Sequence, residues 1–194
     1  DGVENDAFVE YAQANNIICI RGDEENVLER LIRCGDLGGA TDIFRSTSES
    51  PFPYFDLIGE AWAQHVDNNN DATFLDNIID GCGFEILSLD VLKKSHNEGE
   101  DRHRSELCTL YIRENKNQFN LGYIDPPEKL SRKDMRLTVD YPEDLIVCRA
   151  VYEKFKDSAP KIPLLDVVDF LDDNTQLLKL TSPFCEEGYS TMYL

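Results

Sequence analysis

The sequence lacks any long apolar run, because no segment approaches the roughly 18 consecutive apolar residues that a membrane-spanning helix requires. A helical membrane protein is therefore excluded. Basic residues are also scarce, since 19 lysines and arginines stand against 38 acidic residues and the formal net charge is -19. Such a charge repels a phosphate backbone and an anionic membrane surface alike, so neither nucleic acid nor a membrane is an expected partner.

The six cysteines and three histidines show no Cys-x-x-Cys pair and no metal-ligand spacing. Because at least Cys19 and Cys148 fall on apolar faces, we interpret the cysteines as reduced core thiols of a cytoplasmic protein. His96 and His103 could form a metal pair, but no third ligand has a defined spacing, and a surface loop is the favoured interpretation. The hydroxyls near position 48 lack a paired base, so covalent catalysis is not expected.

The chain has 194 residues, enough for one hydrophobic core. We expect a single domain over residues 1–194, with residues 157–194 as its C-terminal extension. Strand-like and helix-like apolar patterns alternate, which is typical of an α/β domain with a largely parallel sheet. The chain begins Asp1-Gly2-Val3 without methionine, in the style of a loop, so we expect that a preceding segment is missing.

Short apolar runs and helical periodicity predict the individual elements. The expected strands are 17–21, 41–47, 72–75, 84–87, 119–124 and 136–139, of which 17–21 reads as a buried strand. The expected helices are 5–15, 24–34, 56–68, 89–98, 106–115, 145–155 and a shorter one after Pro160. Residues 48–53 are expected to form a loop, because two closely spaced prolines cannot sit inside a ladder.

The most informative segment is Arg136-Leu-Thr-Val-Asp140-Tyr-Pro142-Glu-Asp144-Leu. It predicts a strand that ends in a carboxylate and turns at once into a helix, with proline and acids suited to the first helical turn. Asp140 lies where the strand meets the helix, at the edge where open α/β sheets bind ligands. Placement alone leaves Asp140 evenly balanced between a helix cap and a ligand-binding residue.

The run from Arg136 to Leu145 resembles the closing signature of the spore-coat polysaccharide cytidylyltransferases, relatives of the acylneuraminate and 3-deoxy-manno-octulosonate cytidylyltransferases. Further segments resemble the pattern of this family in the same order, at 20–30, 45–51, 83–88 and 106–112. The resemblance spans nearly the whole chain up to about Phe155. It implies a three-layer, nucleotide-diphospho-sugar-transferase-like (Rossmann-like) fold with a mixed, mostly parallel sheet.

Members of this family join CTP to an acidic sugar or a similar acceptor and release pyrophosphate. The resemblance therefore implies a Mg²⁺-dependent enzyme that transfers CMP to an acidic sugar or phosphonate acceptor, in surface polysaccharide or glycoconjugate biosynthesis. Such chemistry needs neutralisation of charge more than covalent help, which is why carboxylates that hold magnesium are central. By the resemblance, Glu49 and Asp140 are the catalytic metal ligands, and Arg21, Arg30, Arg45 and Glu85 face the nucleotide or acceptor.

Two departures from the family pattern keep alternatives open. The family's first strand and phosphate-gripping loop would precede Asp1, so this chain alone is expected not to bind CTP productively. Glu49 replaces an aspartate, and its longer arm moves the carboxylate by about one methylene, although magnesium tolerates little error in geometry. The alternatives are a nucleotide-sugar glycosyltransferase of the same fold and a non-catalytic domain for binding or assembly. Relatives commonly dimerise, which makes a homodimer a candidate assembly.

Overall fold

The computed structural model describes residues 2–192. The contacts divide the chain into two compact units. Unit 1 contains Asp1–Ile43 and Leu87–Phe119, and unit 2 contains Phe44–Ile86 and Asn120–Leu194. The single domain expected over residues 1–194, with 157–194 as its extension, stays a prediction.

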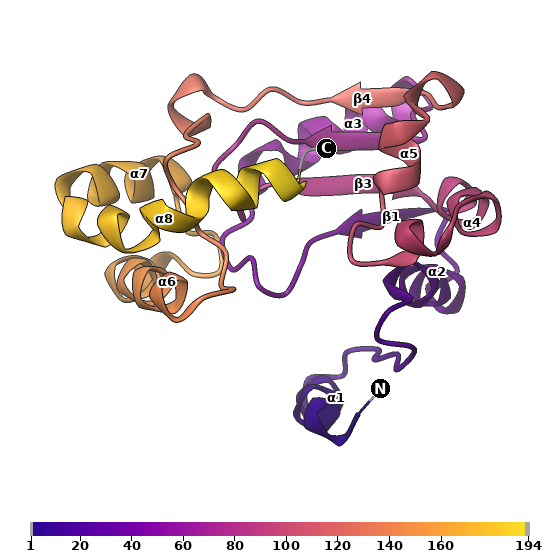
Figure 1. Ribbon diagram of the computed structural model, residues 1–194, viewed down its shortest axis with the longest axis horizontal. Helices are drawn as coiled ribbons and strands as arrows, with labels where there is room; N and C mark the ends of the chain where they lie inside the picture. The colour runs from indigo at the N-terminus through magenta and orange to yellow at the C-terminus, as the bar shows by residue number, and fades with distance from the viewer. Residues whose placement is uncertain (1, 193–194) are drawn as a thin grey trace. The chain divides into compact units, whose positions relative to one another are not determined.

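A four-stranded sheet has the strand order β1-β3-β2-β4 (Figure 1). Its strands are Asp42–Arg45 (β1), Ala72–Leu75 (β2), Phe84–Ser88 (β3) and Leu121–Tyr123 (β4). β2 and β4 run parallel, with Ala72 opposite Leu121 and Phe74 opposite Tyr123. Every residue of β2 is buried, as expected for a strand covered on both faces. The predicted α/β class is confirmed.

Unit 1 consists largely of helices. They are η1 (Val3–Asn5), α1 (Asp6–Ala14), α2 (Val27–Gly38), α4 (Leu89–Glu98), η3 (Asp101–Arg104), α5 (Leu110–Glu114) and η4 (Lys116–Gln118). α2 begins after Asn26, whose side-chain oxygen accepts a hydrogen bond from the backbone N–H of Glu29. It ends at Gly39, whose φ of 62° is left-handed and therefore favours glycine. α2 packs against α4.

Unit 2 contains helices from both the middle and the C-terminal part of the chain. They are η2 (Phe55–Leu57), α3 (Ile58–Asp67), η5 (Glu128–Leu130), α6 (Pro142–Phe155), η6 (Lys156–Ser158), α7 (Leu164–Asp173) and α8 (Thr175–Met192). α8 contacts both α6 and α7, and Figure 1 shows the three helices grouped together. The helix expected after Pro160 is α7, and its Val167, Val168 and Leu171 are buried in the core together with Ile79.

The buried strand expected at 17–21 is wrong. These residues form no strand, and Ile17 and Ile18 are 55% and 66% exposed. A strand requires a neighbouring backbone to receive its hydrogen bonds, and no segment within residues 2–192 forms a ladder with this one. The run has the apolar composition of a buried strand, but composition alone does not provide a neighbouring strand with which it can pair.

The cysteine and histidine interpretations are corrected in part. All six cysteines are free thiols. Cys148 is buried as expected, and burial raises its pKa to about 12, but Cys19 and Cys34 are exposed and do not belong to the core. His103 is 4% exposed and is thus not a surface-loop residue. Its burial has a physical cause, since its Nε2 lies 2.9 Å from Glu114 and its Nδ1 accepts from the Glu100 N–H at 2.8 Å.

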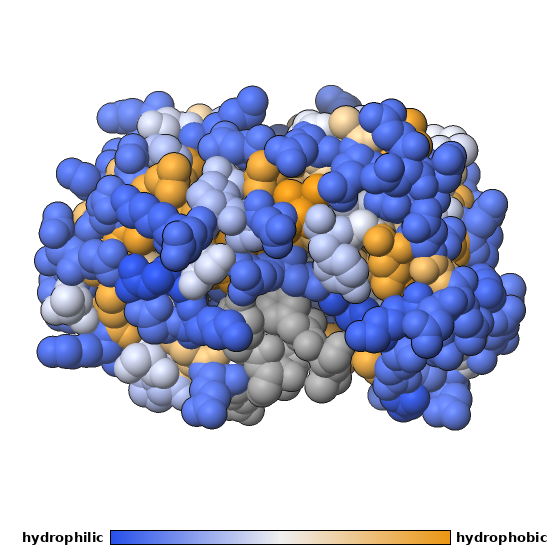
Figure 2. Space-filling model, turned by 90° about the horizontal axis from the view of Figure 1, so that it is seen from above, coloured by the Kyte–Doolittle hydropathy of each residue, from blue (hydrophilic) through white to orange (hydrophobic). Residues whose placement is uncertain are grey.

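Figure 2 shows hydrophilic residues over most of one face, with hydrophobic residues in small, separated groups. This distribution agrees with the large excess of acidic residues in the sequence. Among the helices of residues 2–192, none is both long enough and apolar enough to cross a membrane.

Candidate functional site

The segment that precedes α6 approaches two other parts of unit 2. Leu137 donates its N–H to the carbonyl of Asp80 at 2.8 Å, and Val139 donates to the carbonyl of Glu49 at 2.9 Å. The segment 136–139 is therefore not the continuous strand expected from the sequence. Its only strand-like pairing among the described residues is an isolated parallel bridge between Arg136 and Asp80. The expected strand is wrong because the segment divides its hydrogen bonds between two neighbours.

Gly81 makes this close approach possible. Its φ is 85°, and a β-carbon there would lie 2.6 Å from the backbone nitrogen of Thr138 and 2.7 Å from the carbonyl of Leu137. A side chain would thus meet backbone atoms that cannot rotate away, in a conformation that residues with a β-carbon disfavour. Glycine at this position sets the path of the chain toward Asp140.

Arg136 is the centre of a buried ion-pair cluster. Its side chain is 4% exposed and pairs with Asp80 at 2.5 Å and Asp144 at 3.1 Å, whose side chains are 1% and 0% exposed. The third carboxylate partner is Asp140, which is 47% exposed. Burying a guanidinium is costly unless its donors are paired, and each of its three nitrogens here has a carboxylate partner.

This cluster carries more acids than bases. Burial raises the pKa of Asp80, while the neighbouring guanidinium of Arg136 acts in the opposite direction. Oδ1 of Asp80 is buried and has no hydrogen-bond partner in the described part of the chain. Three carboxylates thus surround a single guanidinium, and only that of Asp140 is substantially exposed.

Asp140 has one oxygen held and one open. Its Oδ2 receives hydrogen bonds from Nη2 of Arg136 and from Oγ1 of Thr138, the latter at 3.3 Å. Among the groups that the structure describes, none is hydrogen-bonded to its Oδ1. The N–H groups of Asp140 and Tyr141 both donate to the carboxylate of Asp144 at 3.0 Å. Asp144 therefore accepts the backbone hydrogen bonds at the N-terminus of α6. The side chain of Asp140 therefore does not cap this helix.

Glu49 is tied by its backbone to the segment that leads to Asp140. Its carbonyl accepts from Val139 and from the hydroxyl of Thr138, at 2.9 and 3.3 Å. Its side chain is half-buried. The structure thus brings the loop of Glu49 and the segment of Asp140 together, and the role of the pair as metal ligands stays a prediction.

The candidate donors are carboxylates, which are among the ligands that magnesium accepts. Within residues 2–192, no group of three or more histidine, cysteine, aspartate or glutamate side chains is arranged to hold a metal ion. Magnesium keeps several waters and is commonly bound by one or two carboxylates together with substrate phosphates. Glu49 and the open oxygen of Asp140 are carboxylate donors of this kind, and they would hold the ion.

The other predicted binding residues fall into two groups. Arg45 of β1 and Glu85 of β3 pair at 2.8 Å in unit 2, with side chains 20% and 12% exposed. Arg21 belongs to unit 1 and pairs with Asp6 at 2.5 Å. Arg30 also belongs to unit 1, and its Nε is buried with no hydrogen-bond partner among the described residues. The structure brings Arg45 and Glu85 together, and the substrate-binding roles of all four stay predictions.

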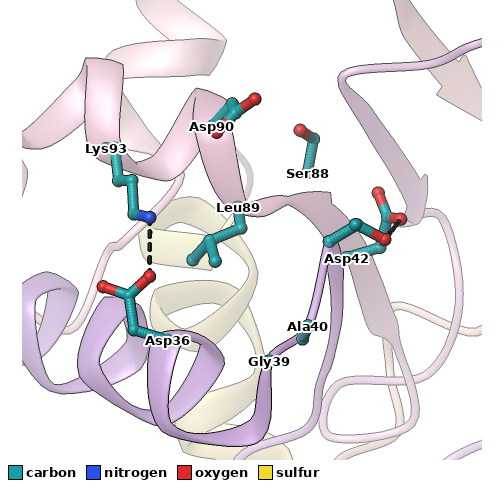
Figure 3. Close-up of a pocket in the computed structure, with 9 residues that line it drawn as sticks. Asp36, Gly39, Ala40, Asp42, Ser88, Leu89, Asp90 and Lys93 are labelled. Atoms are coloured by element: carbon teal, nitrogen blue, oxygen red, sulfur yellow. Dashed lines mark hydrogen bonds and ion pairs between the residues drawn. The ribbon is translucent and has the colours of Figure 1, made fainter.

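Two cavities of the described part of the chain are lined by other residues. One cavity, of about 400 Å³, lies in unit 1 (Figure 3), where Lys93 and Asp36 pair at 2.6 Å and Asp42 and Asp90 also belong to the lining. Its acidic lining is unsuited to a triphosphate. A second cavity, of about 490 Å³ in unit 2, is lined mainly by amide side chains at positions 64, 68, 70 and 120.

Sequence reasoning did not identify Asp80, Arg136 or Asp144 as a site. A signal was present, because Asp80 follows Ile78-Ile79 and Arg136 follows a methionine and precedes a leucine. A charged residue inside an apolar run is seldom buried without a partner. The sequence did not show that the two residues pair, since they are 56 positions apart.

No family model matches the sequence. The chain is 30% identical over 186 residues to the uncharacterized protein MJ1063 of Methanocaldococcus jannaschii, a match that covers 96% of this chain and 76% of that protein. It is 27% identical over 155 residues to the spore coat polysaccharide biosynthesis protein SpsF of Bacillus subtilis, which covers 79% of this chain and 64% of SpsF.

A solved structure of a cytidylyltransferase from Leptospira borgpetersenii serovar Hardjo-bovis matches the fold with a TM-score of 0.81 at 18% identity. The match covers 92% of this chain and 75% of that chain. The expected resemblance to the cytidylyltransferases is thereby confirmed. The chain belongs to the family of MJ1063, and its fold is similar to that of the Leptospira cytidylyltransferase.

Proposed function

We propose that the protein is a Mg²⁺-dependent cytidylyltransferase that transfers CMP from CTP to an acidic sugar or phosphonate acceptor, in surface polysaccharide or glycoconjugate biosynthesis. The observation that carries this proposal is the placement of Asp140, half-exposed before α6 with one oxygen held and the other open. Two relatives support it, since one is named for spore coat polysaccharide biosynthesis and the other is a cytidylyltransferase by name.

In the proposed reaction an acceptor oxygen attacks the α-phosphorus of CTP. A new oxygen–phosphorus bond forms, the bond between the α-phosphorus and the bridging oxygen breaks, and pyrophosphate leaves with that electron pair. Magnesium, when bound, neutralises charge on the phosphates. Neutralisation of the phosphate charge is especially important for this protein, because its net charge of -19 repels the triphosphate.

The chain's own residues would position the reactants. Asp140 and Glu49 would hold the metal through their carboxylates, on segments that hydrogen bonds join to one another. The ion pair of Arg45 with Glu85 fixes a guanidinium on the sheet, where it would meet the nucleotide or the acceptor. A preset geometry is what phosphoryl transfer mainly needs from a protein.

The test is pyrophosphate release by the full-length protein, with CTP, Mg²⁺ and a panel of nonulosonate, other acidic-sugar and phosphonate acceptors. Acceptor-dependent release that EDTA abolishes and that Asp140→Ala removes is the expected result. Asp134→Ala is a matched control, because Asp134 is an exposed acid of the same unit that pairs with Arg132. If the full-length protein shows no metal-dependent binding of CTP, the proposal fails.

The same assay separates the alternatives. A nucleotide-sugar glycosyltransferase would consume a nucleotide sugar and release no pyrophosphate from CTP, and its metal loop would carry an acidic Asp-x-Asp pattern where this chain has Ser48-Glu49-Ser50. A non-catalytic domain would bind nucleotide or acceptor without turnover.

A further inference from the structure

We propose that Arg136 is a positioning residue for Asp140, an inference that rests on the proposed function. Its guanidinium holds one carboxylate oxygen of Asp140 and leaves the other oxygen open, where it would bind the metal. Arg136 itself is 4% exposed, so it acts through Asp140 and does not contact the substrate.

Two buried carboxylates hold the guanidinium of Arg136 in place independently of Asp140. Nη1 donates to Asp80 at 2.5 Å, and Nε lies 3.1 Å from both oxygens of Asp144. Both of these carboxylates are buried. Because the guanidinium is planar, anchoring two of its nitrogens sets the position of the third, Nη2, which donates to Asp140.

Asp144 also fixes the backbone of the residue that Arg136 orients. The same carboxylate that binds Nε of Arg136 accepts from the N–H of Asp140 at 3.0 Å. Asp140 is therefore held at its main chain by Asp144 and at its carboxylate by Arg136. Two such restraints leave the side chain little freedom to turn its open oxygen away.

Helix α8 covers the buried side of this cluster. A β-carbon at Gly188 would lie 2.5 Å from Oδ2 of Asp80 and would collide with Nη1 of Arg136, so the helix backbone lies directly against the ion pair. Phe184 of the same helix stacks on Tyr141 with ring centroids 4.1 Å apart. Such a cover excludes water and thereby strengthens the charge interactions beneath it.

Groups that orient a metal ligand usually change metal affinity or activity by about 10- to 100-fold when they are altered. Arg136→Lys keeps the positive charge, but one ammonium group cannot contact three carboxylates in the fixed plane of a guanidinium. We therefore expect the Mg²⁺ concentration for half-maximal CMP transfer to rise by about 10- to 100-fold. The KM for CTP at saturating Mg²⁺ should change little.

Arg132→Lys is the matched control in the same unit. Arg132 also pairs with two carboxylates, Asp134 at 2.8 Å and Asp172 at 2.9 Å, but it is not bonded to Asp140. Its half-saturating Mg²⁺ concentration should equal that of the wild type. If Arg136→Lys lowers activity equally at all Mg²⁺ concentrations, with unchanged half-saturation, Arg136 only supports the fold and the proposal is overturned.

Binding of Mn²⁺ to the full-length protein, followed by electron paramagnetic resonance, gives a readout that does not need turnover. The proposal expects binding that Asp140→Ala abolishes and that Arg136→Lys weakens. If Arg136→Lys does not fold, Asp80→Asn removes one ionic anchor of the guanidinium at similar size, and it should weaken binding in the same direction. Mn²⁺ binding at Asp140 without CMP transfer overturns the proposed function alone, whereas no Mn²⁺ binding by the wild type overturns both.

Discussion

Arg136 and Asp80 form an ion pair of 2.5 Å between side chains that are 4% and 1% exposed. At this depth both charges lose their hydration, a cost that their mutual attraction and hydrogen bonds must offset. Asp144, which is fully buried, depends on the same guanidinium. Removing Arg136 would therefore leave two buried carboxylates without a cation.

Arg136→Met is expected to lower the free energy of unfolding by about 3–5 kcal/mol, the range for a buried pair that loses one partner. Urea denaturation of the variant and the wild type measures this loss. Arg132→Met is the control, because Arg132 is more exposed and should cost only about 0–1 kcal/mol. If both variants lost the same free energy of unfolding, burial of the Arg136 cluster would make no additional contribution to stability.

Gly81→Ala and Gly39→Ala separate backbone strain from collision. Both glycines are left-handed, at φ of 85° and 62°, but a β-carbon at Gly39 meets nothing within 4 Å. Gly39→Ala should therefore cost only the conformational penalty of about 1–2 kcal/mol. Gly81→Ala should cost about 1–3 kcal/mol more, because its β-carbon meets the backbone of Leu137 and Thr138. Urea unfolding measures both, and similar values would contradict the close approach.

Asn26 provides a local test of helix α2. Its side-chain oxygen accepts from the N–H of Glu29 at 3.1 Å, a donor that the helix itself leaves unpaired. Asn26→Ala should lower stability by about 1 kcal/mol, whereas Asn26→Asp keeps the acceptor and should cost less. Thermal or urea denaturation distinguishes them. An alanine variant as stable as the aspartate variant would argue against this cap.

Local patterns in the sequence predicted the elements whose boundaries are set locally. β2 and α4 have the predicted ends, because β2 is a short apolar run between polar turns and α4 lies between Ser88 and Gly99. The helix α8 was not predicted, since Pro183 lies inside it and Gly188 weakens its periodic pattern. Packing against α6 and α7 compensates for both residues in the fold.

The sequence could indicate only those candidate site residues that are recognisable from their own neighbours in the chain. Asp140 could be identified from its own neighbours, because a strand-like run ends there and a helix begins. Its partner Asp80 lies far away in sequence, and the pairing of Arg136 with Asp80 arises only when two segments meet. The sequence likewise left Asp140 balanced between cap and ligand, and the hydrogen bonds of Asp144 removed the first choice.

Glu114 should make unit 1 sensitive to acid. Hydrogen bonds from Arg102 and then His103 lower the pKa of Glu114 from 4.5 to about 2. Because its folded-state pKa lies below the unfolded value, ionised Glu114 stabilises the fold above about pH 4.5, and this contribution is lost as the pH falls toward 2. Glu114→Gln should therefore lose less stability than the wild type over this interval.

The acid test uses urea unfolding at several pH values between 7 and 2. Glu24→Gln serves as the control, because Glu24 is an exposed glutamate of the same unit. The control should follow the wild-type curve, whereas Glu114→Gln should be less stable at pH 7 and flatter below about pH 4.5. Parallel curves for all three proteins would contradict a stabilising role for the carboxylate of Glu114.

Glu49→Ala should affect metal binding without affecting the fold. The hydrogen bonds that join this loop to Thr138 and Val139 use the carbonyl of Glu49, so alanine retains them. Stability should stay within about 0.5 kcal/mol of the wild type, as for most substitutions outside a core. The half-saturating Mg²⁺ concentration for CMP transfer should rise by about tenfold or more, because one of two carboxylate ligands is lost.

Glu49→Asp shortens the side chain but keeps the carboxylate. A wild-type or lower half-saturating Mg²⁺ concentration in this variant would show that the carboxylate itself binds the metal. If Glu49→Ala and the wild type respond identically to Mg²⁺, Glu49 is an ordinary loop acid and Asp140 alone supplies the protein ligand.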